Sequence, residues 1–287
     1  MKYLITGAGG QLGSEWVRFL SEQKVSFKAY GSDGLNISDR SRLDEIFDKE
    51  IPDIVINCAA YTKVDQAENE PDEAFLVNET GVKNLVEVCK QTGSKLVHFS
   101  TDYVFPGESS DNERYPEGYP EDAETNPVNV YGKSKRAGEV ILEQSGIHWL
   151  LVRVSWLCGA TGHNFVKTMI RLAGEKDSLN VVNDQFGTPA FTFDVVERTS
   201  GLIQRNQAGI FHISSSGKIS WADFAREIFN QTGQLVVVNE VSSSEFNTVA
   251  KRPAFSLLSN RKIVTSGLPQ PGWKEGLETL IRQLKNQ

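Results

Sequence analysis

The sequence feature that most constrains the fold of this chain is a glycine-rich loop directly after the first apolar run. Gly7, Gly10 and Gly13 have the spacing G-x-x-G-x-x-G, between a short apolar segment and an amphipathic stretch that begins at Gln11. Glycines at this spacing allow a tight turn and let the backbone approach a pyrophosphate, while the N–H groups of the following helix face its negative charge. The loop therefore predicts a dinucleotide-binding unit at the start of the chain.

Short apolar runs alternate with amphipathic stretches through the N-terminal half. We expect strands at Tyr3–Thr6, Val25–Tyr30, Ile54–Cys58, Lys95–Ser100 and Trp149–Val154, and helices at Gln11–Glu22, Arg40–Asp48, Pro71–Gln91 and Val130–Gln144. Apolar strands that are each followed by a helix indicate a parallel sheet covered on both faces. The predicted fold class is α/β, a Rossmann-type doubly wound parallel sheet with a smaller C-terminal α/β lobe.

The second half shows a looser pattern of elements. We expect residues 1–156 to form the dinucleotide-binding domain and residues 157–287 to form mainly a substrate-binding lobe, with some later strands and helices returning to the large sheet. Between Thr101 and Tyr131, residues 106–127 are rich in Gly, Pro, Ser and acidic residues. This segment is either a solvated loop or a mobile lid, because long loops in compact domains often have a function.

Composition and charge argue against some classes of binding partner and some cellular locations. The net charge is −7 and no basic block occurs, which argues against a broad nucleic-acid surface. No apolar run approaches the ~20 residues that cross a membrane, and the early glycine loop leaves no room for a signal peptide. Cys58, Cys89 and Cys158 lack paired spacing and fit reduced thiols. We expect a cytoplasmic protein, and no spacing of ligating residues predicts a metal site.

Tyr131 and Lys135 form a Tyr-x-x-x-Lys motif on an expected helix. Residues four apart lie on one helix face, and an ammonium beside a phenol lowers its pKa from about 10. Tyr131 is therefore a candidate proton donor, although the motif alone also occurs by chance on surface helices. Thr101 ends the fourth expected strand, where ligands bind in open α/β sheets, and its hydroxyl can bond a developing oxyanion.

Six further segments together resemble one family. They are Asn57-Cys58-Ala59-Ala60-Tyr61-Thr62, Phe99–Phe105, Tyr131-Gly132-Lys133-Ser134-Lys135, Arg153-Val154-Ser155-Trp156, Asp184–Pro189 and Lys251-Arg252-Pro253. The chain resembles the extended short-chain dehydrogenase/reductase family, and within it the dTDP-4-dehydrorhamnose reductases, from Met1 to the last helix. The resemblance implies reduction of the C4 ketone of dTDP-4-dehydro-L-rhamnose to dTDP-L-rhamnose, a polysaccharide precursor, by NADPH or NADH.

The resemblance also assigns residues to roles. The implied catalytic residues are Thr101, Tyr131 and Lys135, with Tyr131 as the proton donor. The implied cofactor contacts are Gly7, Gly10, Gln11, Leu12, Gly13, Asn36, Ile37, Ala59, Ala60, Tyr61, Thr62, Tyr131 and Lys135. The implied substrate contacts are Thr101, Asp102, Tyr103 and Trp156. The partner is a nucleotide sugar, and a homodimer is common among such enzymes although the sequence does not decide it.

Two departures from the family pattern leave alternatives open. The adenine-side pair is Asn36-Ile37 where relatives have Asp, and Leu157-Cys158 follows Trp156 where relatives often have a tyrosine. Ser32 and Lys28 slightly favour NADPH, but NADH stays open. The alternatives are a reductase or epimerase for another nucleotide sugar, and a non-catalytic NAD(P)-binding regulatory subunit.

Overall fold

The centre of the molecule is a six-stranded parallel sheet. A computed structural model describes residues 1–246 and 248–286. The strand order is β10-β5-β4-β3-β1-β2, and all pairings are parallel. The strands are β1 (Tyr3–Thr6), β2 (Phe27–Tyr30), β3 (Ile54–Asn57), β4 (Lys95–Thr101), β5 (Trp149–Val154) and β10 (Gly209–His212). The predicted Rossmann-type sheet is confirmed, and its strand order reverses between β1 and β3, where ligands bind in such sheets.

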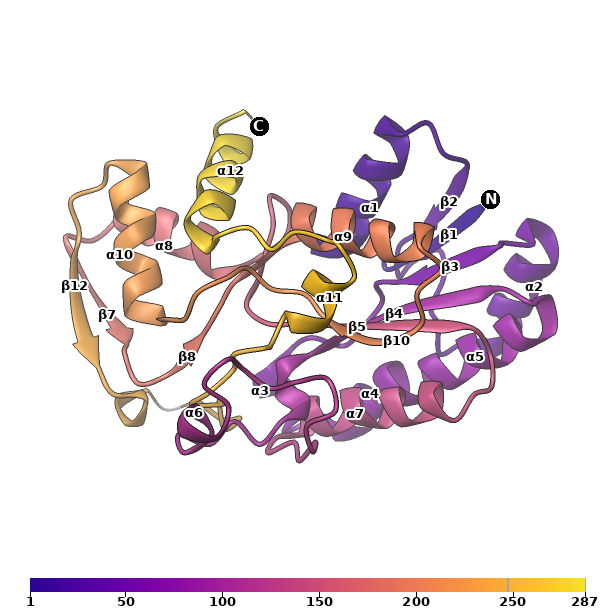
Figure 1. The fold of residues 1–287 in the computed structure, drawn as a ribbon, viewed down its shortest axis with the longest axis horizontal. Coiled ribbons are helices and arrows are strands. Elements are labelled where there is room, and N and C mark those ends of the chain that lie inside the picture. Colours follow the sequence, from indigo (N-terminus) through magenta and orange to yellow (C-terminus); the bar gives the residue numbers. More distant parts are fainter. Residues whose placement is uncertain (247, 287) are drawn as a thin grey trace.

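Helices cover both faces of this sheet (Figure 1). The helices α1 (Gln11–Glu22) and α9 (Thr192–Gln204) lie on one face, and α2 (Arg40–Glu50), α5 (Gly81–Thr92) and α7 (Val130–Glu143) lie on the other. Each face has its own apolar cluster, built around Trp16 and Phe211 on the first and around Phe47 and Leu151 on the second. Burial on both faces explains why the strands read as continuous apolar runs.

A smaller lobe packs beside the carboxyl ends of the strands. Its helices are α8 (Phe165–Ala173), α10 (Trp221–Thr232) and α12 (Trp273–Lys285). Its strands form short pairs: β7 (Ser178–Val182) with β12 (Val237–Val241), β8 (Phe186–Gly187) with β11 (Ile219–Ser220), and β6 (Leu157–Cys158) with β9 (Ala190–Phe191). An aromatic-rich core that includes Phe191, Phe224 and Phe229 holds this lobe together.

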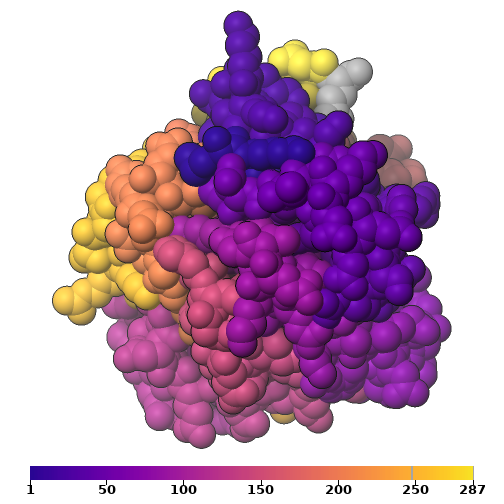
Figure 2. Space-filling model, turned by 90° about the vertical axis from the view of Figure 1, so that its right-hand side faces the viewer, coloured from indigo at the N-terminus to yellow at the C-terminus, as the bar shows by residue number. Residues whose placement is uncertain are grey.

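Some of the C-terminal half returns to the large sheet, as expected. The strand β10 pairs with β5 at the sheet edge, and α9 packs against α1. Figure 2, which views the molecule from the end nearest the N-terminus, shows orange and yellow C-terminal segments along one side of the indigo and purple half. The chain therefore crosses between lobes more than once, and the boundary at residue 156 stays a prediction.

The expected long helix at Pro71–Gln91 is divided. It consists of α4 (Pro71–Phe75), a π-helical segment Leu76–Thr80 and α5. The shorter elements elsewhere are α3 (Val64–Ala67), the 3₁₀ turns Asp102–Val104 and Ser243–Glu245, α6 (Asp111–Arg114) and α11 (Arg261–Thr265). A π-helical turn inside a helix often marks a functional site, and here it places Asn78 beneath the site described below.

Most of the segment 106–127 is packed against the C-terminal half. Tyr119 is buried, and its ring stacks on Phe105 with the centroids 4.3 Å apart. Its backbone N–H donates to the Leu257 carbonyl at 2.9 Å, and the Arg153 guanidinium donates to the Glu121 carbonyl at 3.1 Å. These contacts hold the middle of the segment in place, so only its first residues, from Gly107 to Ser110, border the large cavity described below.

Candidate active site

The glycine loop follows β1 and touches the loop that follows β3. Gly7 has φ +65°, and a Cβ at this position would lie 2.5 Å from the backbone nitrogen of Ala59. At Gly13, a Cβ would overlap the carbonyl oxygen of Gly7 and lie 2.7 Å from the Ala8 Cα. Gly7 therefore allows the turn, and Gly13 allows α1 to pack against the loop. These are two of the roles that glycines have in dinucleotide-binding loops.

The N-terminus of α1 is suited to a bound anion. Gly10 precedes α1 with extended backbone, no side chain caps the helix, and its first turn contains no acidic residue. A Cβ at Gly9 would meet no atom within 4 Å, so the loop leaves open space there. Uncapped N–H groups at a helix start attract negative charge, and this end of the structure therefore fits a pyrophosphate.

The predicted cofactor contacts lie around this loop, but some of their side chains are buried and others are exposed. The side chains of Leu12 and Ile37 are buried in the two sheet cores. These two residues therefore present mainly their backbone to a ligand. Asn36 is exposed, and its Oδ1 accepts hydrogen bonds from the backbone and hydroxyl of Ser38 at 3.0 and 2.7 Å. Gln11 Oε1 accepts a hydrogen bond from Asn164 of the smaller lobe at 3.0 Å.

The segment after β3 is held in position by two asparagines. Asn57 Oδ1 accepts the backbone N–H of Ala59 at 3.1 Å. Asn78, in the π-helical turn, accepts the Tyr61 backbone N–H at 2.9 Å and donates to the Tyr61 carbonyl at 3.1 Å. Ala60 is half-buried and Thr62 is exposed on the same segment. These bonds fix a backbone ridge opposite the glycine loop.

The three predicted catalytic residues come from β4 and α7. Thr101 ends β4, and its hydroxyl donates to Asp102 Oδ1 at 3.0 Å and accepts the Tyr103 backbone N–H at 3.2 Å. Asn129 caps α7 by accepting the Gly132 N–H at 2.8 Å, and this places Tyr131 in the first turn. The Tyr131 ring meets the Tyr103 ring edge to face, with centroids 5.5 Å apart. A Cβ at Gly132 would overlap the Tyr103 carbonyl, so glycine permits this approach.

The expected lowering of the Tyr131 pKa by Lys135 is wrong for the protein without a cofactor. Burial raises the pKa of Tyr131 above its usual value, and the charge of Asp102 raises it further, while the Thr101 hydroxyl acts in the opposite direction. Lys135 is not among the groups that act on this pKa, because its amine is bonded to β4. Lys135 Nζ donates to the Phe99 carbonyl at 2.7 Å and lies 3.4 Å from Nε2 of His98.

A cavity of about 980 Å³ is lined in part by Tyr103, whose ring packs edge to face on Tyr131. Of the predicted substrate residues, Tyr103 is part of the cavity wall. Thr101 and Asp102, which precede Tyr103 along the chain, are buried. The wall contains aromatic side chains, cations and hydroxyl groups: Phe165, Trp221, Phe246, Lys251, Arg252, Ser243, Ser244 and Thr248. Arg252 donates to the Tyr103 hydroxyl at 3.4 Å and pairs with Asp65 at 2.5 Å. The cavity therefore offers aromatic surfaces and positive charge near the candidate proton donor.

Trp156 stands behind the wall of this cavity. Its ring stacks on Trp221, with the centroids 3.5 Å apart, and its backbone has φ +46°. A Cβ at Gly187 would lie 2.8 Å from the Trp156 ring, so glycine makes room for the indole. In this arrangement Trp221 faces the cavity and Trp156 supports it, and the substrate contact assigned to Trp156 stays a prediction.

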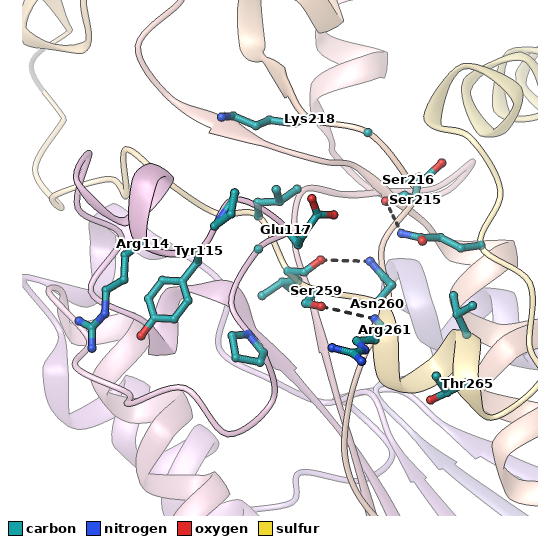
Figure 3. Close-up of a pocket in the computed structure, with 18 residues that line it drawn as sticks. Arg114, Tyr115, Glu117, Ser215, Ser216, Lys218, Ser259, Asn260, Arg261 and Thr265 are labelled. Atoms are coloured by element: carbon teal, nitrogen blue, oxygen red, sulfur yellow. Dashed lines mark hydrogen bonds between the residues drawn. The ribbon is translucent and has the colours of Figure 1, made fainter.

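A second cavity, of about 780 Å³, lies away from the catalytic residues (Figure 3). Its wall includes Arg114, Lys218 and Arg261, but Figure 3 shows their cationic ends pointing in different directions. None of Thr101, Tyr131 and Lys135 lines either cavity, but Tyr103, whose ring packs against Tyr131, lines the cavity of about 980 Å³ and not this one. Converging polar groups are what mark a ligand site, so the cavity lined by Tyr103 is the candidate active site.

Neither a membrane-spanning helix nor a group of metal ligands occurs among the described residues, 1–246 and 248–286. No helix in this part of the chain is both long and apolar enough to cross a membrane. Within the same ranges, no three His, Cys, Asp or Glu side chains are grouped as metal ligands would be.

Asp102 makes stability depend on pH. Burial raises its pKa from 3.8 to about 6. The folded protein therefore binds a proton that the unfolded chain releases near pH 4, and ionisation costs stability as the pH rises from about 4 through 6. We expect Asp102→Asn to be about 3 kcal/mol more stable than the natural protein at pH 8 and to lose this advantage near pH 4. Urea unfolding at both pH values measures it, and an equal difference at both would contradict the raised pKa.

Sequence reasoning missed several residues that support the site. The sequence predicts no role in the site for His98, Asn57 or Asn78. Asn57, Asn78 and His98 are each about 1% exposed and hydrogen-bonded. A polar residue inside an apolar strand, as in Asn57 and His98, was the available signal, because buried polar groups need partners.

Comparisons with known proteins agree with this geometry. The family model described as RmlD substrate binding domain matches residues 1–286. The spore coat polysaccharide biosynthesis protein SpsK of Bacillus subtilis is 38% identical over 98% of this chain and 97% of its own length. A dTDP-4-dehydrorhamnose reductase of Sinorhizobium fredii is 36% identical, covering 98% and 97%. The structure of dTDP-4-dehydrorhamnose reductase from Bacillus anthracis in complex with NADP has TM-score 0.93 and 39% identity, covering 98% and 99%.

Proposed function

Because the chain belongs to the RmlD substrate binding domain family, we propose that it is an NAD(P)H-dependent dTDP-4-dehydrorhamnose reductase. Its near full-length similarity to reductases of that name supports the activity. The observation that carries the proposal is the packing of Tyr131 against Tyr103, which lines a cavity of about 980 Å³ with cationic and aromatic walls. A relative solved with NADP supports the nicotinamide cofactor.

The glycine loop and the segment after β3 are the parts that would hold the cofactor. The uncapped start of α1 receives the pyrophosphate, and the ridge Ala59–Thr62 faces it across the switch point between β1 and β3. Asn36 is the exposed polar group on the adenine side. A nicotinamide cofactor held there would supply the hydride for the sugar's C4 atom.

Tyr131 donates the proton that the C4 oxygen needs in this reaction. Reduction turns the ketone oxygen into an alkoxide, and a phenol is an effective acid for it because both groups have high pKa values. Burial holds Tyr131 in its protonated form, as a proton donor must be before reaction. Thr101, at the end of β4, offers a hydroxyl to the same oxygen. Lys135 orients the cofactor ribose from the same face of α7.

The cavity wall fits a nucleotide sugar. Phe165 and Trp221 provide flat apolar surface for a base, while Lys251 and Arg252 provide positive charge for a diphosphate. Tyr103 shares the cavity wall with these groups and packs against Tyr131, so the hexose belongs beside Tyr103. The alternative of a non-catalytic regulatory subunit does not require a proton donor packed against a residue of the cavity wall.

A coupled assay tests the function. dTDP-4-dehydro-L-rhamnose is made in situ by the upstream enzymes, and loss of absorbance at the nicotinamide band is followed with NADPH and NADH separately. We expect oxidation that depends on the sugar nucleotide, with NADPH favoured. Cofactor binding without oxidation of either form would support the regulatory alternative, and turnover only with another dTDP-hexose would change the substrate.

Arg252 is expected to act in substrate binding. Its guanidinium is about one-quarter exposed, lines the cavity, and bonds both Tyr103 and Asp65. Hydrogen bonds to charged groups contribute about 1.5–3 kcal/mol, so Arg252→Met should raise KM at least about tenfold and change kcat much less. Steady-state kinetics measures the split. Arg261→Met, in the cavity of Figure 3, is the matched control and should leave KM unchanged.

A further inference from the structure

A chain of buried polar groups runs from the segment after β3 to the amine of Lys135. Asn57 Nδ2 lies 2.9 Å from Nδ1 of His98, and Nε2 of the same ring lies 3.4 Å from Lys135 Nζ. All three side chains are at most 2% exposed. The chain lies below the cofactor site and connects β3, β4 and α7, and the proposed mechanism assigns no role to His98.

The backbone sets the direction of the hydrogen bonds in this chain. The Ala59 N–H, whose hydrogen cannot move, donates to Asn57 Oδ1 at 3.1 Å, and the Thr6 hydroxyl donates to the same oxygen at 2.6 Å. The reversed amide would turn an N–H group of Asn57 against that of Ala59. Asn57 therefore presents its nitrogen to His98 as a donor.

This donor determines the tautomer of His98. A ring nitrogen that accepts from Asn57 has no proton of its own, so Nδ1 is bare and the neutral ring carries its proton on Nε2. Burial keeps the ring neutral by lowering the pKa of His98 well below its usual value, and the Lys135 charge acts in the same direction. The Nε2–H group then faces Lys135 Nζ.

An N–H group facing Lys135 is compatible with one protonation state of the amine and unfavourable for the other. The ammonium form has only donors, so its N–H groups would oppose the Nε2–H of His98. The uncharged amine donates to the Phe99 carbonyl at 2.7 Å and has a lone pair for His98. We propose that His98 is a positioning residue that acts through Lys135, holding Nζ in place and favouring its uncharged form before the cofactor binds.

Other groups near Lys135 act in both directions. Burial is the largest influence and lowers the pKa of Lys135 to about 8, while the Glu139 carboxylate and the Cys58 thiol raise it. Glu139 is itself paired with Arg153 at 2.8 Å, which weakens its effect on the amine. The inference rests on the proposed role of Lys135 in the cofactor site. Its test uses the cofactor-free protein, so its result is independent of whether the reductase assay succeeds.

The first measurement needs no variant. ¹⁵N NMR of the cofactor-free protein, labelled in histidine, reports which ring nitrogen of His98 is protonated. We expect Nε2 protonated and Nδ1 bare between pH 6 and pH 9. A proton on Nδ1, or an imidazolium in this range, would overturn the proposal even if every variant failed to fold.

The second measurement follows the amine itself. ¹³C NMR of lysine side chains, with the Lys135 signal assigned by its loss in Lys135→Met, gives its titration midpoint. In His98→Gln an uncharged amide carbonyl replaces the N–H facing Nζ, and we expect the midpoint to rise by at least about one pH unit. Thr6→Val removes a bond at the far end of the chain without changing its direction, and should leave the midpoint in place. No rise in His98→Gln, or an equal rise in Thr6→Val, would sink the proposal.

Discussion

Tyr131→Phe is expected to lower kcat by at least two orders of magnitude and to leave cofactor affinity nearly unchanged. The phenol hydroxyl acts only as the C4 oxygen gains its negative charge, and loss of a general acid costs about 10²–10⁴ in rate. The ring itself, which packs edge to face on Tyr103, is retained in phenylalanine. Single-turnover kinetics and a fluorescence titration with NADPH measure the two quantities.

The control for this substitution removes a phenol elsewhere. Tyr3 is buried in the sheet core, and no role in the site is assigned to it, so Tyr3→Phe should keep both kcat and cofactor affinity. If Tyr131→Phe retained more than about one-tenth of the natural rate, the proton would come from another group. A parallel loss of cofactor affinity would instead indicate a structural role for the hydroxyl.

Gly13→Ala is expected to damage both the fold and the cofactor site. The added methyl group would overlap the Gly7 carbonyl and lie 2.7 Å from the Ala8 Cα, so α1 must move away from the loop. Overpacking of this kind costs about 1–3 kcal/mol, and the displaced helix start no longer aims its N–H groups at the pyrophosphate. We expect a lower midpoint of urea unfolding and at least about tenfold weaker NADPH binding.

Gly31→Ala is the control for Gly13→Ala. It separates the steric overlap of an added methyl group from the loss of a glycine as such. A Cβ at Gly31 meets no atom within 4 Å, and its φ is not positive. This substitution should leave stability within about 0.5 kcal/mol of the natural protein. Equal damage from the two alanines would show that the close approach at Gly13 is not what the cofactor site depends on.

Local sequence patterns predicted the secondary structure of the sheet and its helices well. The bounds Tyr3–Thr6, Gln11–Glu22 and Trp149–Val154 agree with the structure. Periodicity and glycine spacing are local signals, so they report on local structure. The π-helical turn at Leu76–Thr80 was not predicted, and Tyr61 and Ser134, the partners of its residue Asn78, lie outside the helix.

In the candidate site, too, the sequence predicted what neighbouring residues determine and missed what contacts between distant residues determine. The motif Tyr131–Lys135 was correctly placed on one helix face, but the expected pair is not formed without cofactor, since Lys135 turns to β4 and His98. The segment 106–127, read as either a solvated loop or a lid, is largely packed, because Tyr119 bonds to residues about 140 positions later. Neither partner is visible from spacing within a motif.

The sequence by itself determined the parallel α/β sheet, the anion-binding loop and the identity of the groups able to move a proton. These follow from periodicity, glycine positions and side-chain chemistry, all of which are properties of short segments. Only the tertiary structure decided that Trp221 rather than Trp156 faces the cavity, and that His98 and Asn57 lie beneath Lys135. Burial and hydrogen-bond direction depend on residues brought together from different strands, and these interactions set the protonation of buried groups.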